Sequence, residues 1–267
     1  MHYKILCSDL DGTLLSTKSD VSDYTIAEIN RIKEKTRIIL VSARMPKAMT
    51  YIQERLGITN EVIICYNGAL MLDQGTELFS TIIDIDHIKE LNLLAKQYHI
   101  KLGLYYKDEW YVESHTDRVE KEIHHTRTVP TYQPTHKTLD DWETRRIGAH
   151  KLMLMGTKSN IDELLPKLEV LFKTSMNLYR SNDTLIEATP QSISKLSAIE
   201  HLLKDTGSLK DVIAFGDNYN DKQMLEQVHF GVAVANAREE VKEIADFVTL
   251  TNTDDGVAHF LNLHFNI

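Results

Sequence analysis

Short apolar runs alternate with amphipathic segments at both ends of the chain. Five runs of four or five residues lack the polar alternation of a half-exposed strand; they lie at 3–7, 38–41, 62–65, 212–215 and 231–234. Strands that are buried on both faces of a parallel sheet have this pattern. We therefore predict parallel strands near both ends of the chain, with a further strand at 247–250.

Helical patterns separate these predicted strands. Ser22 can cap a helix that carries isoleucines at helical spacing on one face. Pro46 lies near the start of the next helical pattern, and Gly57 lies where that pattern ends. Alternating strands and helices are typical of an α/β fold with an open, mostly parallel sheet.

The middle of the chain has a different pattern. A predicted helix is followed by an aromatic, hairpin-like stretch at 104–112, a polar region, and then a strand, a helix and two more strands. This order is typical of an α+β domain that folds on its own. We therefore expect a discontinuous core of residues 1–81 and 187–267, interrupted by an α+β cap of residues 82–186.

Composition narrows the possible partners. The chain has 267 residues, of which 42% are hydrophobic and 26% charged, as in an ordinary globular enzyme. Its net charge of -9 argues against binding to nucleic acid or to an anionic membrane, because both need a basic surface. An anionic substrate stays possible, because a bound metal can reverse the charge of a local site.

Cysteine usage and the apolar runs point to a cytoplasmic protein. Cys7 and Cys65 each lie in an apolar run, where small buried side chains are expected. The apolar stretch at the N-terminus is too short for a signal peptide, and no run approaches the roughly 20 residues of a membrane span.

Polar side chains follow three of the predicted strands at the point where each strand ends. Asp9 and Asp11 follow the first run, Ser42 follows the second, and Asp217 and Asp221 follow the run at 212–215. Each feature alone is weak, because an aspartate after a strand is usually a turn or cap residue. The carboxyl ends of parallel strands meet at one edge of the sheet, so we expect all five side chains to converge there.

A cluster of four carboxylates needs a cation, because like charges otherwise raise one another's pKa. Mg²⁺ suits such a site, since it binds through a few carboxylates together with a substrate phosphate. Phosphoryl transfer needs mainly positioning and neutralisation of the phosphoryl oxygens. Ser42, the amides of the loop at Gly12 and Thr13, and a lysine could donate to those oxygens.

These motifs resemble those of the haloacid dehalogenase-like (HAD) superfamily. The segment from Asp9 to Leu14 is similar to the first motif of that superfamily, Ser42 to the second and Lys195 to the third. The segment from Gly216 to Asp221 is similar to the fourth. The Cof-type phosphatases (subclass IIB) have further similar segments, which here are Asn67-Gly68-Ala69 and the stretch from Gly231 to Ala237.

The resemblance implies a Rossmann-like, doubly wound core with a cap inserted after the third strand. Asp9 would be the nucleophile and Asp11 the general acid and base. Mg²⁺ would be held by Asp9, by the backbone carbonyl of Asp11 and by Asp217, with support from Asp221. The remaining roles would be phosphate binding by Leu10, Gly12, Ser42, Ala43, Lys195 and Asn220, and possible substrate contacts by Arg44 and Asn67.

Two motifs depart from the family pattern. The second motif usually reads Thr-Gly-Arg, whereas this chain has Ser42-Ala43-Arg44, which keeps the hydroxyl. The third motif lacks its flanking glycines, although Ser194 could begin the helix that presents Lys195.

An intact Asp11 favours hydrolysis. Haloacid dehalogenases lack this aspartate, and cation-pumping ATPases of the superfamily have threonine there. We therefore expect a Mg²⁺-dependent phosphatase that acts on a small phosphorylated metabolite (a sugar phosphate, a nucleotide or a cofactor phosphate), as a monomer or small homo-oligomer. A sugar phosphomutase and a non-catalytic phospho-ligand-binding protein remain alternatives.

Overall fold

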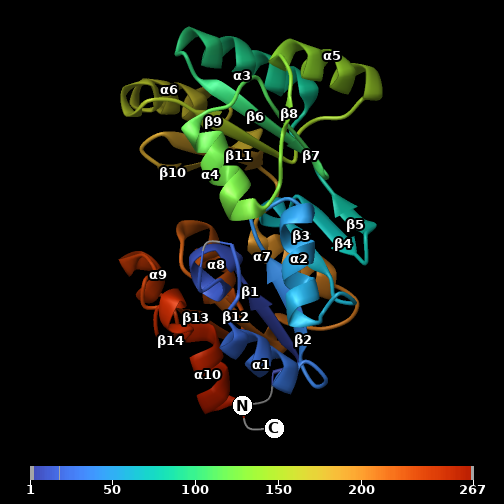
Figure 1. Cartoon of the computed structure of the whole chain (residues 1–267), viewed down its shortest axis with the longest axis vertical. Helices are drawn as coiled ribbons and strands as arrows, with labels where there is room; N and C mark the ends of the chain where they lie inside the picture. Colours follow the sequence, from blue (N-terminus) through green and yellow to red (C-terminus); the bar gives the residue numbers. More distant parts are fainter. Residues whose placement is uncertain (1–2, 18, 266–267) are drawn as a thin grey trace. The chain divides into compact units, whose positions relative to one another are not determined.

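The computed structural model describes residues 3–17 and 19–265 and divides the chain into two compact units (Figure 1). The core unit contains Met1–Phe79 and Ser194–Ile267, and the inserted unit contains Ser80–Ile193. The second boundary therefore lies after residue 193, whereas the sequence placed it after residue 186. The reason is that the last strand of the inserted sheet continues to Pro190.

The core unit is built on an eight-stranded sheet. In sheet order its strands are β14 (Phe247–Val248), β13 (Phe230–Ala233), β12 (Val212–Gly216), β1 (Ile5–Ser8), β2 (Arg37–Val41), β3 (Ile63–Cys65), β4 (Leu70–Asp73) and β5 (Thr76–Ser80). The six strands from β14 to β3 are parallel, and β4 pairs antiparallel with β3. The predicted parallel strands are confirmed, although β14 ends two residues before the predicted end at 250. The β4–β5 hairpin was not predicted.

Helices connect and cover these strands. They are α1 (Asp23–Ile32), α2 (Lys47–Leu56), α7 (Lys195–Leu203), α8 (Lys222–Gln227), α9 (Glu239–Lys242) and α10 (Gly256–His264), with short turns η1 (Leu10–Leu14), η2 (Tyr66–Gly68), η3 (Leu209–Asp211), η4 (Tyr219–Asp221) and η5 (Asn252–Asp254). Helix α1 contacts both α2 and α10, while α7 contacts α8. Ser22 caps α1 by accepting a hydrogen bond from the Thr25 amide, and Gly57 ends α2 in the left-handed conformation. Both predicted helix ends are confirmed.

The inserted unit contains a six-stranded sheet with four helices. In sheet order its strands are β10 (Met176–Asn182), β11 (Leu185–Pro190), β9 (Lys151–Met155), β6 (Lys101–Tyr106), β7 (Glu109–Val112) and β8 (Thr131–Tyr132), and its helices are α3 (Ile85–Gln97), α4 (Asp117–Thr126), α5 (Thr135–Arg145) and α6 (Lys158–Leu171). All pairings in this sheet are antiparallel except that of β7 with β8. The predicted aromatic hairpin is confirmed as β6 and β7. Helices α4 and α5 lie in the region that was predicted only as polar.

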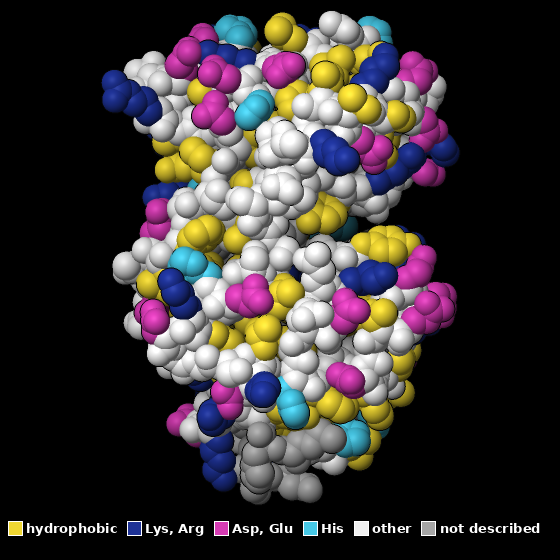
Figure 2. Space-filling view, turned by 180° about the vertical axis from the view of Figure 1, so that it is seen from behind, with side chains coloured by type: hydrophobic (Ala, Val, Ile, Leu, Met, Phe, Trp, Pro, Cys, Tyr) yellow, Lys and Arg dark blue, Asp and Glu magenta, His cyan; other side chains and the backbone are white. Residues whose placement is uncertain are grey.

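Apolar side chains fill both units. Cys7 and Cys65 are buried thiols, as predicted. On the face drawn in Figure 2, acidic and basic side chains lie interspersed over the surface. Among the described residues, no helix has the length and apolar character needed to cross a membrane.

Candidate active site

Strand β1 places Asp9 in the middle of the core sheet. This strand lies between β12 and β2, and Ser8 is in register with Phe215 of β12. The Asp9 amide donates to the Phe215 carbonyl oxygen over 3.0 Å. The carboxyl ends of β1 and β12 therefore lie side by side. The residues that follow the two strands come together there, although they are about 200 positions apart in the sequence.

Three of the four predicted carboxylates form a cluster. Asp9, Asp217 and Asp221 each offer an oxygen that lies within 4.8 Å of the others. Asp9 and Asp221 are buried, and Asp217 is half-buried. The predicted convergence of these aspartates at the sheet edge is therefore observed.

Lys195 joins two members of this cluster. Its Nζ lies 2.6 Å from Asp9 Oδ1 and 2.6 Å from Asp221 Oδ1, and its side chain has no exposed surface. Ser194 caps helix α7 by accepting a hydrogen bond from the Ser197 amide, so Lys195 is the first residue of that helix. The cap predicted for this lysine is confirmed, and the helix holds the ammonium group against the Asp9 carboxylate.

The charges in the cluster do not balance. Burial raises the pKa of Asp9 well above its usual value; Lys195 opposes this rise, while Asp221 and Asp217 add to it. Burial and the charge of Asp221 likewise raise the pKa of Asp217 to about 7, against the opposing effect of Lys195. Burial lowers the pKa of Lys195, but Asp221 and Asp9 outweigh it and raise that pKa. One ammonium group faces three carboxylates, so the ionised site would carry a net negative charge that a bound cation could neutralise.

Asp221 also holds the loop after β12. Its Oδ2 accepts hydrogen bonds from the amides of Asp217 and Asn218, each over 3.0 Å. A Cβ atom at Gly216 would lie 2.5 Å from Asp221 Cβ, so only glycine allows this approach. With one oxygen on Lys195 and the other on two amides, Asp221 fixes the position of Asp217.

Gly12 and Thr13 bring the loop after β1 onto Asp217. Gly12 has φ +83°, and a Cβ atom there would lie 2.5 Å from Asp217 Oδ2. The Thr13 hydroxyl donates to Asp217 Oδ1 over 3.2 Å. Glycine is thus required at position 12 both for its backbone conformation and for the close approach of the carboxylate. Leu10, which begins this loop, is buried, and its carbonyl accepts from the Leu15 amide.

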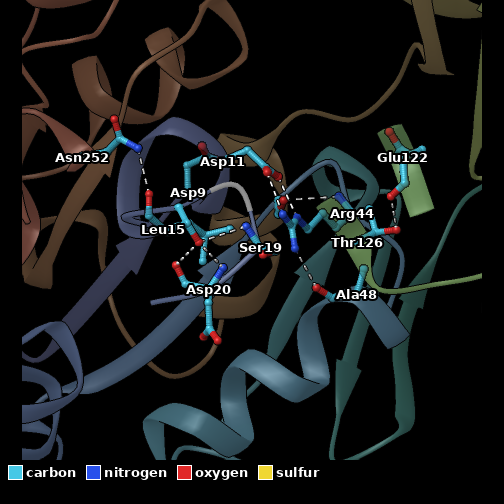
Figure 3. A network of polar contacts seen from close by, with 12 residues as sticks. Asp9, Asp11, Leu15, Ser19, Asp20, Arg44, Ala48, Glu122, Thr126 and Asn252 are labelled. Carbon is cyan, nitrogen blue, oxygen red and sulfur yellow. Dashed lines mark hydrogen bonds and ion pairs between the residues drawn. The ribbon is translucent and has the colours of Figure 1, made fainter. Parts of the chain in front are cut away.

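Asp11 lies apart from the carboxylate cluster. Its carboxylate accepts two hydrogen bonds from Arg44, one from Nε to Oδ2 and one from Nη2 to Oδ1, both over 2.7 Å (Figure 3). The Asp11 side chain is 49% exposed, whereas that of Arg44 is 3% exposed. The structure therefore corrects one expectation from the sequence, because the Asp11 carboxylate is not grouped with the other three. The Arg44 guanidinium is bound to Asp11, and its contact with substrate remains a prediction.

The remaining predicted residues surround the ends of β2 and β3. Ser42 is buried, and its hydroxyl oxygen accepts from the Arg44 amide over 3.3 Å. Ala43 is half-buried beside it. The Asn220 side-chain amide donates to Asn67 Oδ1 over 3.0 Å, which joins two loops of the core unit. The structure therefore brings these side chains to the same end of the sheet; their contacts with phosphate remain predictions.

Two asparagines that were not predicted as site residues, Asn236 and Asn252, support the loop after β1. Asn236 donates from Nδ2 to the Gly12 carbonyl oxygen over 2.8 Å. Asn252 donates from Nδ2 to the Leu15 carbonyl oxygen over 2.8 Å (Figure 3), and its amide donates to Asn236 Oδ1. Asn236 lies in the Gly231–Ala237 motif, so the motif was the only available signal for this contact.

The residues present fit a divalent cation. The donor set consists of carboxylate oxygens, which are hard ligands of the kind that Mg²⁺ prefers. Burial raises the pKa of Asp9 and of Asp217, and the neighbouring carboxylate charges add to the rise, which a bound cation would counteract. Asp9, Asp217 and Asp221 are the residues that could hold the ion.

Several known proteins that are similar to this chain are named as phosphatases or putative phosphatases. A putative phosphatase of Haemophilus influenzae is 35% identical over 273 aligned positions, which cover 99% of each chain. The pyridoxal phosphate phosphatase YbhA of Escherichia coli is 28% identical, again over 99% of each chain. The 5-amino-6-(5-phospho-D-ribitylamino)uracil phosphatase YitU of Bacillus subtilis is 26% identical over 98% of each chain.

Solved structures and a family match agree with these relatives. A haloacid dehalogenase-like hydrolase from Bacteroides thetaiotaomicron superposes with a TM-score of 0.88 at 28% identity, over 98% of this chain and 99% of that one. A protein of Thermotoga maritima superposes with a TM-score of 0.85, also at 28% identity, over 98% and 97%. Residues 6–261 match the family described as haloacid dehalogenase-like hydrolase. The α/β fold with a Rossmann-like core and an inserted α+β unit is therefore confirmed, and the chain belongs to the haloacid dehalogenase-like hydrolases, as an enzyme of the Cof-type branch.

Proposed function

We propose that this enzyme is a Mg²⁺-dependent phosphatase that hydrolyses a small phosphomonoester through an aspartyl-phosphate on Asp9. The observation that carries the proposal is the position of the Asp9 carboxylate. It is buried at the end of a central strand, 2.6 Å from the Lys195 ammonium, in a cluster with Asp217 and Asp221. A carboxylate in this setting can act as a nucleophile once its charge and that of the phosphoryl group are neutralised.

In the first half of the reaction, an Asp9 oxygen forms a bond to phosphorus while the bond from phosphorus to the leaving oxygen breaks. Asp11 gives a proton to that leaving oxygen, which departs as an alcohol. Lys195 keeps Asp9 oriented through the whole step. Mg²⁺, when bound by Asp9, Asp217 and Asp221, would neutralise charge on the phosphoryl oxygens.

In the second half, Asp11 takes a proton from water and the water oxygen attacks phosphorus. The bond between phosphorus and the Asp9 oxygen breaks, which regenerates the carboxylate and releases inorganic phosphate. Donors for the phosphoryl oxygens would come from Ser42, from Asn220 and from the backbone amides near Gly12 and Ala43.

We assign substrate selection to the inserted unit, as the family resemblance implies. The named relatives act on pyridoxal phosphate and on a phosphoribitylaminouracil, which are small phosphorylated compounds. A small phosphorylated metabolite is therefore the substrate class that we propose for this chain.

The test is a panel of phosphorylated metabolites assayed for released phosphate with Mg²⁺ and with EDTA. The unmodified chain is expected to hydrolyse some of them only with the metal, and Asp9→Asn is expected to lose this activity. Equal rates for the two proteins, or no turnover on any compound, would contradict the proposal.

A further inference from the structure

Arg44, one of the two predicted substrate contacts, forms an ion pair with another predicted residue of the site, Asp11. Its guanidinium makes two parallel hydrogen bonds to the two Asp11 oxygens, each over 2.7 Å. This planar, two-point contact fixes both the place and the orientation of a carboxylate, which a single contact cannot do. The sequence motif indicated only a possible contact of Arg44 with substrate.

Arg44 is itself held from the other side. Its Nη1 donates to the Ala48 carbonyl oxygen over 3.3 Å and to the Tyr51 hydroxyl over 3.0 Å. The Tyr51 hydroxyl donates in turn to the Ser19 carbonyl oxygen over 2.8 Å. Helix α2, which carries Ala48 and Tyr51, therefore provides a rigid support for the guanidinium.

Asp11 needs such a support more than Asp9 does. Asp9 is buried and bound to Lys195. The Asp11 side chain is about half exposed, and Asp11 lies in the turn η1 rather than at the end of a strand. An exposed carboxylate on a turn has several rotamers, and an acid-base group is effective only when it lies in reach of the proton that it moves. The contact with Arg44 selects one of these rotamers.

We infer that Arg44 is a positioning residue for Asp11, which it orients through its two-point hydrogen bond, rather than a residue that binds substrate. This inference rests on the proposed function, because it assigns Arg44 a part in the acid-base steps of that reaction. Its consequence is selective. Formation of the aspartyl-phosphate needs a proton from Asp11 when the leaving oxygen is a strong base, as in an alkyl phosphate. It needs little help when the leaving group is a stabilised phenolate.

The experiment compares kcat/KM across phosphate monoesters whose leaving groups range from p-nitrophenol to glycerol. This parameter covers the steps up to aspartyl-phosphate formation, so it isolates the leaving-group proton transfer. Arg44→Lys keeps the charge but loses the two-point contact. It is expected to lower kcat/KM about 30- to 100-fold for glycerol phosphate and about threefold or less for p-nitrophenyl phosphate.

Two comparisons separate positioning from other roles. Arg55→Lys is the matched control: it makes the same substitution at an exposed arginine of α2 that pairs with Asp20 over 3.5 Å. It should change kcat/KM for glycerol phosphate and for p-nitrophenyl phosphate by no more than about twofold. In the Asp11→Asn background, Arg44→Lys should have little additional effect, because both changes remove the same contact. A substrate-binding arginine would instead raise KM for every ester and add its full effect to that of Asp11→Asn.

Tyr51→Phe provides a second variant in case the Arg44→Lys protein does not fold, which a thermal melt without a cooperative transition would reveal. It removes one support of the guanidinium and should lower the ratio of the glycerol to the p-nitrophenyl rate about three- to tenfold. An equal loss on all esters, full additivity with Asp11→Asn, or an unchanged ratio in both variants would overturn the inference while leaving the phosphatase proposal in place. If the unmodified chain hydrolyses none of the esters, the proposed function fails and the inference fails with it.

Discussion

Each unit of this enzyme contains a buried lysine that lies between two carboxylates, and the two sites differ in their charge balance. In the core unit, Lys195 lies 2.6 Å from both Asp9 and Asp221, with Asp217 beside them. In the inserted unit, Lys151 lies 3.1 Å from Glu187 and 4.0 Å from Glu122. Both lysine side chains are at most 3% exposed, so burial does not distinguish the two sites.

The electrostatic effects on the carboxylates are opposite. Burial tends to raise the pKa of Glu187, but Lys151, the Ser181 hydroxyl and Arg118 together lower it. Burial raises the pKa of Asp9, and two neighbouring aspartates raise it further against Lys195. The inserted site is a balanced ion-pair network, whereas the core site has an excess of negative charge that suits a cation. Of these two sites with a buried lysine, only the core site therefore combines a carboxylate cluster with a charge imbalance that suits a cation.

The largest expected difference between the two sites is the effect on turnover of replacing each lysine. Lys195→Met is expected to lower turnover about 10²–10³-fold, because Asp9 loses the group that orients it. Lys151→Met should leave turnover of a small aryl phosphate within about tenfold, because it touches no proposed catalytic residue. Each change should cost about 3–5 kcal/mol of unfolding free energy, since it leaves a buried carboxylate unpaired. Urea unfolding and a p-nitrophenyl phosphate assay measure the two effects; equal losses of turnover would contradict the distinction.

The pH dependence of stability should have opposite signs at the two sites. Asp217 has a pKa raised from 3.8 to about 7, so the metal-free folded state binds its proton more tightly than the unfolded state does. Its contribution is fully present below pH 3.8 and is lost as the pH rises through 7, at most about 4 kcal/mol in all. Glu187 has a lowered pKa, so its contribution is present above 4.5 and is lost in acid.

Urea unfolding in EDTA at several pH values tests these signs. Asp217→Asn should flatten the loss of stability between pH 4 and 7, and Glu187→Gln should flatten the loss in acid. Mg²⁺ should stabilise the unmodified protein more at pH 8 than at pH 5, because the cation competes with protons for the cluster. The same pH profile for both variants would contradict the assignment.

Substituting two glycines that have the same φ angle distinguishes the effect of backbone strain from that of steric crowding against Asp217. Gly12 and Gly75 both have φ +83°, but a Cβ atom at Gly12 would lie 2.5 Å from Asp217 Oδ2, whereas one at Gly75 would meet nothing within 4 Å. Each change to alanine should cost about 1–2 kcal/mol of stability through backbone strain. Only Gly12→Ala should also weaken Mg²⁺ activation, by about tenfold or more. Titration of the rate with Mg²⁺ decides this; an equal effect of Gly75→Ala would exclude crowding as the cause.

The smallest effect is expected at the asparagines that hold backbone carbonyls. Asn236→Ala removes a 2.8 Å hydrogen bond to Gly12, and Asn160→Ala removes a 2.7 Å hydrogen bond to Tyr98 in the inserted unit. Both should cost about 0.5–1.5 kcal/mol of unfolding free energy. Only Asn236→Ala is expected to reduce kcat, about two- to fivefold, because Gly12 belongs to the loop that carries Asp11. Unchanged kcat in Asn236→Ala would show that this loop needs no support from Asn236.

The core fold was predictable because its strands are buried on both faces. Runs such as 38–41 and 212–215 are continuously apolar, which leaves little choice other than a parallel strand. Helices α4 and α5 were missed because few of their positions are apolar: Val119 is the only apolar side chain among the buried described residues of α4. A helix whose buried face also includes Glu122 and Thr126 gives no clear hydrophobic period.

The candidate site was predictable only where the sheet fixes it. Asp9 and Asp217 follow neighbouring strands, so their approach is a consequence of strand order. The two-point contact of Arg44 with Asp11 depends on side-chain rotamers in two separate loops, which residue types and spacing do not determine. The same holds for the hydrogen bond from Asn236 to Gly12.

The central claim is that Asp9 becomes phosphorylated during turnover. Its most direct test is acid quenching of the Asp11→Asn protein after mixing with Mg²⁺ and p-nitrophenyl phosphate, followed by peptide mass spectrometry. If Asp11 is the proposed base that activates water, the intermediate should accumulate in this variant, and a phosphoryl group should be found on the peptide that contains Asp9. Release of p-nitrophenol with no phosphorylated peptide, or a phosphoryl group on any other residue, would contradict the account.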